Sequence, residues 1–334
     1  MRSQEETITV FSTFPGVDRI ELPPNVEHVS HLGATYRDVA KAYLSNANEE
    51  RCFLYNGLSR KVWLLSLLKM LRPNRKRRLV VADMILFVPT TLKERLAAMV
   101  RKQLLSKVDL FLSYARHTEG IRKIYGLPAS RFRYVPFKVN DPEIIARTPS
   151  TDEGYIVVAG QTRRDFTTFR KAIEGLSMPV RIVAPHQEVL LKHGSALTDV
   201  GWPDHVVFVR DAIQAKDFIP QLARARVVVL PILEMNITPS GIGVCLVAMA
   251  LRKCVVVSSG PVADGLLEDG QAIVVPAGDA LALREAIVAA WTNDELRTAT
   301  ANRGFEYARS LGDEKRLHRD VFDTIATLYR SDAT

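Results

Sequence analysis

The chain has 334 residues, 47% of them hydrophobic, which exceeds what one ordinary core requires, so we expect two domains. The net charge is +8, but there is no run of about 18 apolar residues and no basic start followed by an apolar stretch, so we expect neither a membrane span nor a secretory signal. Cys52, Cys245 and Cys254 stand in apolar runs at unrelated spacings, which argues against a disulfide framework or zinc site and for a reducing, cytoplasmic location.

Strand-like and helix-like stretches alternate along the first part of the chain. Strands are predicted at 7–11, 51–55, 79–82, 110–114 and 133–136. Helices are predicted between them at Tyr36–Leu44, Arg60–Leu71, Leu92–Leu105 and 117–125. Elements that alternate at these lengths indicate a parallel sheet with helices on both faces.

A second α/β run follows a polar, turn-rich segment at 140–154, which we interpret as an interdomain linker. The strands of this run are predicted at 155–159, 180–184, 206–209, 227–230 and 255–257, and the pattern at 306–330 is helical. We therefore place one α/β domain at 1–145 and a second at 154–310. Both are expected to be Rossmann-like.

The most informative segment is 225–287. The strand at Val227–Leu230 leads into Pro239-Ser240-Gly241-Ile242-Gly243, which opens an apolar helix. At such a helix N-terminus, the unpaired amides of Gly241, Ile242 and Gly243 and the helix dipole favour an anion. The hydroxyls of Thr238 and Ser240 add further polar groups, and Ser240 is also suited to cap the helix. We predict a diphosphate site here.

This segment resembles the donor-binding core of retaining GT-B glycosyltransferases, in the nucleotide-sugar-dependent family 4, or group 1. The stretch at 108–137 is similar to the family's first-domain run that ends in Tyr-Gly-x-Pro, a strand and Pro. The E-x7-E motif is degenerate, because Val247 replaces its second glutamate and Glu234 matches the first only if 235–239 is an insertion. The matching residues, in the family's order, are Pro231, Leu246, Ala248, Met249, Ala250, Val255, Val256, Asp269, Gly270, Pro276, Gly278, Asp279 and Leu281.

The resemblance implies the GT-B fold, two Rossmann-like domains with a cleft between them and a terminal helix at 312–330 that crosses back onto the first domain. It also implies a nucleotide-diphosphate-sugar as donor substrate on the second domain, no other cofactor, and hexose transfer with retention. Glu234 would then accept hydrogen bonds from the donor sugar. Val247 would lack the ribose contact that the family's carboxylate makes.

The sequence AGQTRRDF at 159–166 lies between a buried strand and a helix. Some relatives have a similar basic loop against the donor diphosphate, which makes Gly160, Arg163 and Arg164 donor-site candidates. An arginine offers forked donors that suit phosphate oxygens and can stabilise a leaving diphosphate, and we favour Arg164 for this role. Asp165 is better placed as a helix cap. The alternative is an ordinary loop with two solvated arginines.

Few other residues have the pattern of catalytic or metal-binding groups. Asp83 follows the strand at 79–82, which makes it a catalytic candidate or a cap, while His117 suits a cap or the solvated surface. The sequence has no Ser-His-Asp arrangement, no histidine pair at metal spacing and no DxD motif, so we expect no metal.

Positive charge is concentrated between Leu58 and Lys138, where 19 Lys/Arg face four acidic residues, a balance of +15 that leaves −7 for the remainder. Within it, an apolar helix joins four consecutive basic residues in Arg60–Arg78. Such a segment suits peripheral binding to an anionic membrane at its inner face, or it is a core helix beside a solvated loop. Without interleaved aromatic residues it does not indicate nucleic-acid binding.

We interpret the chain as a metal-independent glycosyltransferase that moves a hexose to a glycan or lipid-linked acceptor in polysaccharide biosynthesis. Two alternatives stay open. A non-catalytic sugar-nucleotide-binding or scaffold protein of the same fold would explain Val247 directly. An enzyme like the nucleotide-sugar 2-epimerases would use carboxylates and histidines, but few histidines stand at strand ends.

Overall fold

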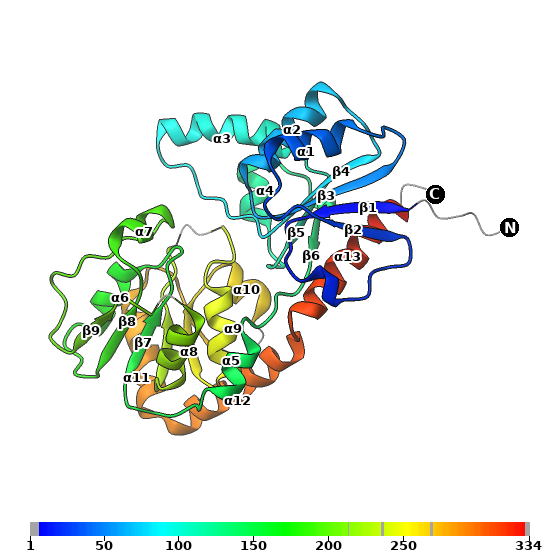
Figure 1. Ribbon diagram of the computed structural model, residues 1–334. Helices are drawn as coiled ribbons and strands as arrows, with labels where there is room; N and C mark the ends of the chain where they lie inside the picture. Colours follow the sequence, from blue (N-terminus) through cyan, green and yellow to red (C-terminus); the bar gives the residue numbers. More distant parts are fainter. Residues whose placement is uncertain (1–6, 213, 235–236, 268–269, 331–334) are drawn as a thin grey trace. The chain divides into compact units, whose positions relative to one another are not determined.

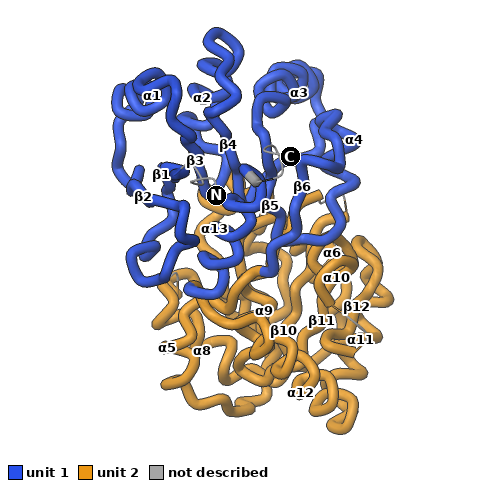
Figure 2. Tube along the Cα trace, turned by 90° about the vertical axis from the view of Figure 1, so that its right-hand side faces the viewer, with its two compact units in different colours: residues 1–136, 315–334 blue, residues 137–314 orange. Residues whose placement is uncertain are grey.

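The computed structural model describes residues 7–330 apart from 213, 235–236 and 268–269 (Figure 1). Contacts divide the chain into two units (Figure 2). Unit 1 comprises the described residues up to Pro136 together with those from Lys315 onward, and unit 2 is Phe137–Glu314. The chain therefore enters unit 2 once and returns to unit 1 at its end.

Unit 1 is built on a six-stranded parallel sheet in the order β2-β1-β3-β4-β5-β6. Its strands are runs of apolar residues that are buried along β3, β4 and β5, as expected for parallel strands covered on both faces. The strands are β1 (Ile8–Ser12), β2 (Val26–Ser30), β3 (Glu50–Asn56), β4 (Arg77–Ala82), β5 (Leu110–Ser113) and β6 (Phe132–Tyr134).

Helices pack on both faces of this sheet. Side chains alternate along β3, so that Phe53 meets the ring of Tyr43 on α1, whereas Cys52 lies beside Tyr329 of α13. The C-terminal helix α13 thus covers the face opposite α1, and Phe322 of α13 also meets the ring of His28. The helices are α1 (Tyr36–Leu44), α2 (Arg60–Leu71), α3 (Leu92–Leu105), α4 (Glu119–Tyr125) and α13 (Glu314–Arg330), with short 3₁₀ turns at Val17–Arg19 and Ala129–Arg131.

Arg77 at the start of β4 is a structural cation. Its side chain is 1% exposed and donates to the backbone carbonyls of Tyr43, Ser45, Asn46 and Glu49. These carbonyls lie at the end of α1 and in the turn that follows, so Arg77 fastens this turn to the amino end of β4. Burial lowers the pKa of Arg77.

The basic run that ends at Arg78 therefore does not form one exposed patch. Besides the buried Arg77, the guanidinium of Arg78 lies over the ring of Tyr329, and Lys76 pairs with Glu50 at 3.8 Å. Because β4 begins within the run and turns side chains toward other elements, the four basic residues do not share one surface, and membrane binding through Arg60–Arg78 stays a prediction.

Unit 2 has a second six-stranded parallel sheet, in the order β12-β11-β10-β7-β8-β9. Counted from β7, this is the 3-2-1-4-5-6 order of Rossmann-type nucleotide-binding sheets. The prediction of an α/β chain with two Rossmann-like domains is confirmed. The strands are β7 (Ile156–Ala159), β8 (Val180–Val183), β9 (Val206–Val209), β10 (Val227–Leu230), β11 (Cys254–Ser258) and β12 (Ile273–Val275).

Every second residue of these strands contributes to one apolar cluster with α6 and α11. Ile156, Val158, Val227 and Val229 pack there with Phe169 and its neighbours. The intervening strand residues point to the other face, where α8 and α9 contact each other and the strands (Figure 1). The helices are α5 (Pro142–Arg147), α6 (Phe166–Ile173), α7 (Gln187–Lys192), α8 (Ala215–Ala223), α9 (Ile242–Ala250), α10 (Pro261–Leu266), α11 (Ala280–Thr292) and α12 (Asp294–Leu311).

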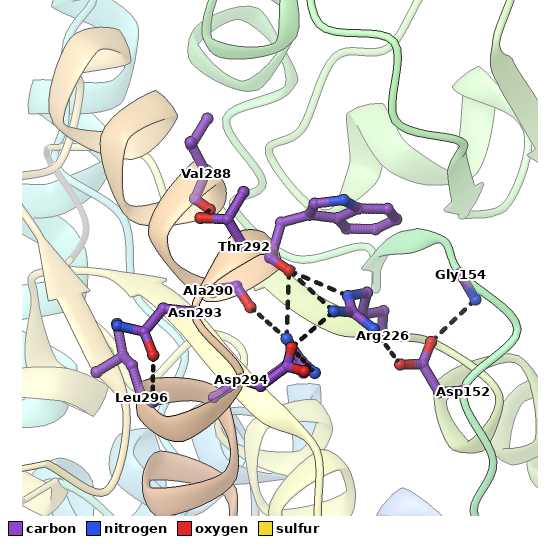
Figure 3. Close-up of polar contacts among 11 residues, drawn as sticks. Asp152, Gly154, Arg226, Val288, Ala290, Thr292, Asn293, Asp294 and Leu296 are labelled. Atoms are coloured by element: carbon purple, nitrogen blue, oxygen red, sulfur yellow. Dashed lines mark hydrogen bonds and ion pairs between the residues drawn. The ribbon is translucent and has the colours of Figure 1, made fainter.

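Arg226 secures the amino end of β10. Its guanidinium bonds Asp152 at 2.7 Å and Asp294 at 2.9 Å, and it donates to the carbonyl of Trp291 (Figure 3). Asp152 in turn accepts from the amide of Gly154. This end of the sheet thus carries a cation whose charge is neutralised by two carboxylates.

Several elements differ from the sequence predictions. The predicted linker at 140–154 lies within unit 2 and contains α5, and the chain passes between the units at Pro136. The helical pattern at 306–330 is divided between α12 and α13 by Gly312. The three cysteines are buried and unpaired, as expected. No described helix is long and apolar enough to cross a bilayer.

Replacing Arg77 should destabilise unit 1. Arg77→Gln cannot reach all four carbonyls, and each buried acceptor left unsatisfied costs about 1–3 kcal/mol. We expect the free energy of unfolding in urea to fall by roughly 3 kcal/mol. The matched variant Arg75→Gln, at an exposed position two residues earlier, should change it by less than about 0.5 kcal/mol. Equal stability of the two variants would contradict the structural role of Arg77.

Candidate functional site

The order of the strands in the unit 2 sheet reverses direction between β7 and β10. Strands β7 and β10 are neighbours, but the chain leaves β7 for α6 on one face and leaves β10 for α9 on the other. In open α/β sheets, the crevice at such a reversal, outside the carboxyl ends of the strands, is where ligands bind. The loops after β7 and β10 are therefore where we expect a ligand to bind.

These two loops are joined by backbone hydrogen bonds. The amide of Asp165 donates to the carbonyl of Pro231 at 2.9 Å, and the amide of Leu233 donates to the carbonyl of Arg163 at 3.0 Å. Arg164 and Ile232 form a short antiparallel bridge between these bonds. The side chain of Asp165 caps α6 through the amide of Thr168, as the sequence indicated. The two loops thus form one connected structure.

Arg164 points into this structure and is 2% exposed. Its Nε donates to the carbonyl of Ala159 at 2.8 Å and its Nη1 to that of Thr162 at 2.9 Å, while its backbone amide donates to the hydroxyl of Ser195 at 2.8 Å. Burial lowers the pKa of Arg164 to about 10, so the side chain stays charged at neutral pH. In the described part of the chain no acidic side chain forms an ion pair with it.

Two glycines make room for the guanidinium. A Cβ on Gly160 would lie 2.4 Å from Nη2 of Arg164, and a Cβ on Gly241 would lie 3.2 Å from its Nη1. Both glycines have positive φ, 104° and 95°, which other residues rarely adopt. The loops after β7 and β10 each contribute one of them, so the charge of Arg164 is held at the junction of the two loops.

The N-terminus of α9 lies at the same junction. Gly241, not Ser240, is the N-cap residue, so the capping role considered for Ser240 is wrong. Thr238 and Ser240 are both buried, and their hydroxyl oxygens lie 3.0 Å apart. Among the described residues, the amides of Gly241 and Gly243 have no hydrogen-bond partner. The amide of Ile242 donates to the carbonyl of Pro239 at 3.3 Å, so the prediction that it is unpaired is wrong. This helix end therefore offers free donors to an anion, and it does so next to Arg164.

A small cavity of about 290 Å³ opens on the other side of Arg164. It is lined by Phe166, Leu191, Ser195 and Leu233 as well as by Arg164 itself. This volume is at the lower end of the range for ligand pockets, so it accommodates only part of a ligand the size of a nucleotide.

The other candidate site residues of unit 2 differ in burial and position. Arg163 has a left-handed backbone with φ 54° and contributes its backbone groups to the loop, and burial lowers the pKa of its side chain. Glu234 is exposed, and its Oε2 lies 3.5 Å from where a Cβ on Gly278 would stand. Val247 is buried within α9. Asp269, one of the residues that carry the resemblance, lies outside the described residues.

Asp83 belongs to unit 1, where it follows β4. Its backbone has φ 50°, and burial raises the pKa of its carboxyl. Burial, together with the nearby charge of Asp83, raises the pKa of Tyr114. His117 is exposed and lies 3.8 Å from Glu119. The described residues contain no cluster of three acidic, histidine or cysteine side chains that could hold a metal ion.

Two neighbours of Arg164 had no signal in the sequence. Ser195 comes from the turn after α7, and Ile232 stands in the loop after β10. Their contribution depends on loops folded against each other, which no local pattern records. The structure thus brings Gly160, Arg164 and Gly241 together and leaves Asp83 in the other unit.

Gly160→Ala should displace the guanidinium of Arg164, because the new methyl group occupies its position. We expect a larger loss of unfolding free energy than in Gly175→Ala, a matched glycine of unit 2 with φ 72° and no neighbour within 4 Å. The matched variant pays only the cost of positive φ, about 1 kcal/mol. Urea denaturation gives the unfolding free energy of both variants, and equal losses would show that Gly160 does not hold Arg164 in place.

The chain was also compared with known proteins. The family model of the "Glycosyl transferases group 1" matches residues 155–293, which include both loops. No curated protein matches the chain at a significant level.

Solved structures resemble the chain along most of its length. Sucrose-phosphate synthase from Thermosynechococcus elongatus has a TM-score of 0.63 at 16% identity, over 97% of this chain and 89% of that one. HepE of Anabaena, solved in complex with UDP-glucose, has a TM-score of 0.65 at 14% identity, over 96% of this chain and 100% of its own. The trehalose-6-phosphate synthase OtsA has a TM-score of 0.60 at 12% identity, over 96% and 99%.

At these identities the solved structures show the fold, while the family match concerns the segment that builds the site. Residues 155–293 form a glycosyltransferase domain of the group 1 family, in a chain whose two units have the GT-B fold.

Proposed function

We propose that unit 2 binds a nucleotide-diphosphate-sugar and that the protein transfers its hexose to a glycan or lipid-linked acceptor with retention. The observation that supports this most strongly is Arg164, a buried cation without an acidic partner among the described residues. An unpaired buried charge costs several kcal/mol, and such a cost is offset when an anion binds. A diphosphate supplies that anion.

The groups around Arg164 suit the departure of a diphosphate. Its guanidinium and the amides at the start of α9 are fixed in the folded chain, so they need no rearrangement when negative charge grows on the leaving group. Thr238 and Ser240 add hydroxyl donors at the same helix end. We propose that these groups, and not a divalent ion, balance the charge.

The sugar end of the donor is assigned to the loops around Glu234. Its carboxylate stands at the loop between β12 and α11, next to Gly278, where it can accept hydrogen bonds from sugar hydroxyls. Since HepE was solved with UDP-glucose, UDP and UDP-glucose are the first ligands to test. Val247 offers the ribose no hydrogen bond, so we expect weaker binding of the nucleoside than a carboxylate would give, by about 1.5–3 kcal/mol.

Asp83 remains the candidate catalytic carboxylate of unit 1. Burial raises the pKa of this carboxyl, and perturbed pKa values cluster at functional sites. In a retaining reaction without a covalent intermediate, the acceptor hydroxyl attacks on the face from which the diphosphate leaves, and its proton passes to a phosphate oxygen. The role left for Asp83 is then to orient the acceptor hydroxyl.

A non-catalytic sugar-nucleotide-binding protein is the second candidate, favoured by Val247 alone. The two candidates differ in slow donor hydrolysis, which a transferase commonly shows and a pure binding protein lacks.

A peripheral location at the inner face of a membrane, in polysaccharide biosynthesis, is part of the proposal and is supported by the net positive charge of residues 58–138.

Replacing Arg164 tests the function separately from the fold. Arg164→Met keeps the volume of the side chain but removes the charge and two hydrogen bonds, so unfolding free energy should fall by about 2 kcal/mol or less. Donor hydrolysis or transfer should fall roughly 10²–10³-fold, the scale for one preorganised donor to a leaving group.

The matched variant is Arg163→Met, whose side chain is only partly buried. Calorimetry with UDP and turnover of UDP-glucose compare the two variants with the wild type. Wild-type affinity and turnover in folded Arg164→Met would overturn the proposal.

A further inference from the structure

Helix α3 of unit 1 carries an apolar stripe on its outer side. Leu92, Leu96, Met99 and Val100 are 76%, 57%, 65% and 62% exposed. Their spacing of four, seven and eight residues places them on one side of a helix. No other described helix has four large apolar side chains exposed to this extent.

The same helix already packs into unit 1 through a different side. Ala98 and Leu105, seven residues apart, are its buried residues, and α3 contacts both α2 and α4. At 100° per residue, these two point roughly opposite to Leu96 and about 100–120° away from Met99. The exposed stripe is therefore a second apolar surface that the fold of unit 1 does not use.

Four of the six polar residues of α3 are cationic. Lys93, Arg95, Arg101 and Lys102 are exposed beside or behind the stripe. The acidic residue of the helix, Glu94, accepts hydrogen bonds from the amides of Thr90 and Thr91 in the N-terminal capping box, and these bonds lower the pKa of its carboxyl to about 2. Net positive charge thus accompanies the apolar stripe.

The neighbouring helix α2 adds to this character. Leu67, Met70 and Leu71, at the C-terminal end of α2, are 46%, 45% and 68% exposed. Their spacing of three and four residues again puts them on one side. Lys69, which lies between them, is instead paired with Asp109 and does not contribute an exposed charge.

We propose that the exposed face of α3, Leu92–Leu105, docks unit 1 on the surface of an anionic lipid bilayer. An apolar stripe bordered by Lys and Arg is the pattern of a helix that lies in the membrane interface. The apolar side chains enter the acyl boundary, and the long cationic side chains reach the head groups. A second copy of the chain fits less well, because pairing two α3 helices brings their cations together.

This surface is independent of the donor site, since it lies in unit 1 and needs no nucleotide. It replaces the four-residue basic run at Arg75–Arg78 as the membrane-binding element, because that run includes the buried Arg77. Its failure would leave the proposed donor site untouched.

Co-sedimentation with vesicles tests the proposal without any activity assay. Wild type should bind vesicles of phosphatidylglycerol and phosphatidylcholine at low salt, and it should bind pure phosphatidylcholine vesicles at least ten-fold less tightly. Binding to the anionic vesicles should weaken with added salt, because salt shortens the Debye length from about 10 Å at 0.1 M to about 3 Å at 1 M. Lys93→Gln with Arg95→Gln and Arg101→Gln should weaken binding by roughly 100-fold, or about five-fold per charge. Leu96→Ser with Met99→Ser should weaken it by about ten-fold or more.

The matched control is Leu281→Ser with Arg309→Gln, two exposed positions on unit 2 helices, which should bind as wild type does. Thermal unfolding checks that every variant is folded. The proposal is overturned if wild type does not sediment with anionic vesicles, if the α3 variants bind as tightly as the control, or if Leu96→Ser dissociates a dimer detected by ultracentrifugation.

Discussion

The positive charge of Arg164 is the feature on which the candidate site depends. Two carbonyl oxygens and two glycines hold the guanidinium inside unit 2, and no carboxylate of the described chain neutralises it. The amino end of the same sheet shows the opposite arrangement, because Arg226 there is bonded to two aspartates. The paired cation stabilises the fold, whereas under the proposed function an anionic ligand offsets the cost of the unpaired one.

The order of the sheet explains why this charge stands where it does. Strands β7 and β10 are adjacent, and the helices that follow them lie on opposite faces of the sheet. The loops after the two strands therefore begin side by side and then run to opposite faces. Gly160 and Arg164 come from the first loop and Gly241 from the second, and the short bridge between Arg164 and Ile232 joins the loops. A Rossmann-like topology thus brings together, from residues far apart in the sequence, the groups of the proposed anion site.

Much of this could be predicted from the sequence, and the exceptions have physical reasons. The apolar runs of the central strands were predicted at the correct positions, since burial on both faces leaves a clear pattern, and α1, α2 and α3 were predicted within their observed bounds. The edge strands β2 and β12 were missed because they are short or mixed in polarity. The geometry of the candidate site is partly local, in its glycines, but the contribution of Ser195 depends on packing between loops. The structural use of Arg77 was equally invisible, because a basic run indicates charge and not burial.

The central claim is that the diphosphate of the donor lies between Arg164 and the start of α9. A crystal structure of the protein with UDP measures this directly. The account predicts a phosphate oxygen within about 3 Å of the Arg164 guanidinium and of the amides at Gly241 and Gly243, the usual distance of charge-assisted hydrogen bonds. A diphosphate bound elsewhere on unit 2, with Arg164 still contacting only Ala159 and Thr162, would contradict it.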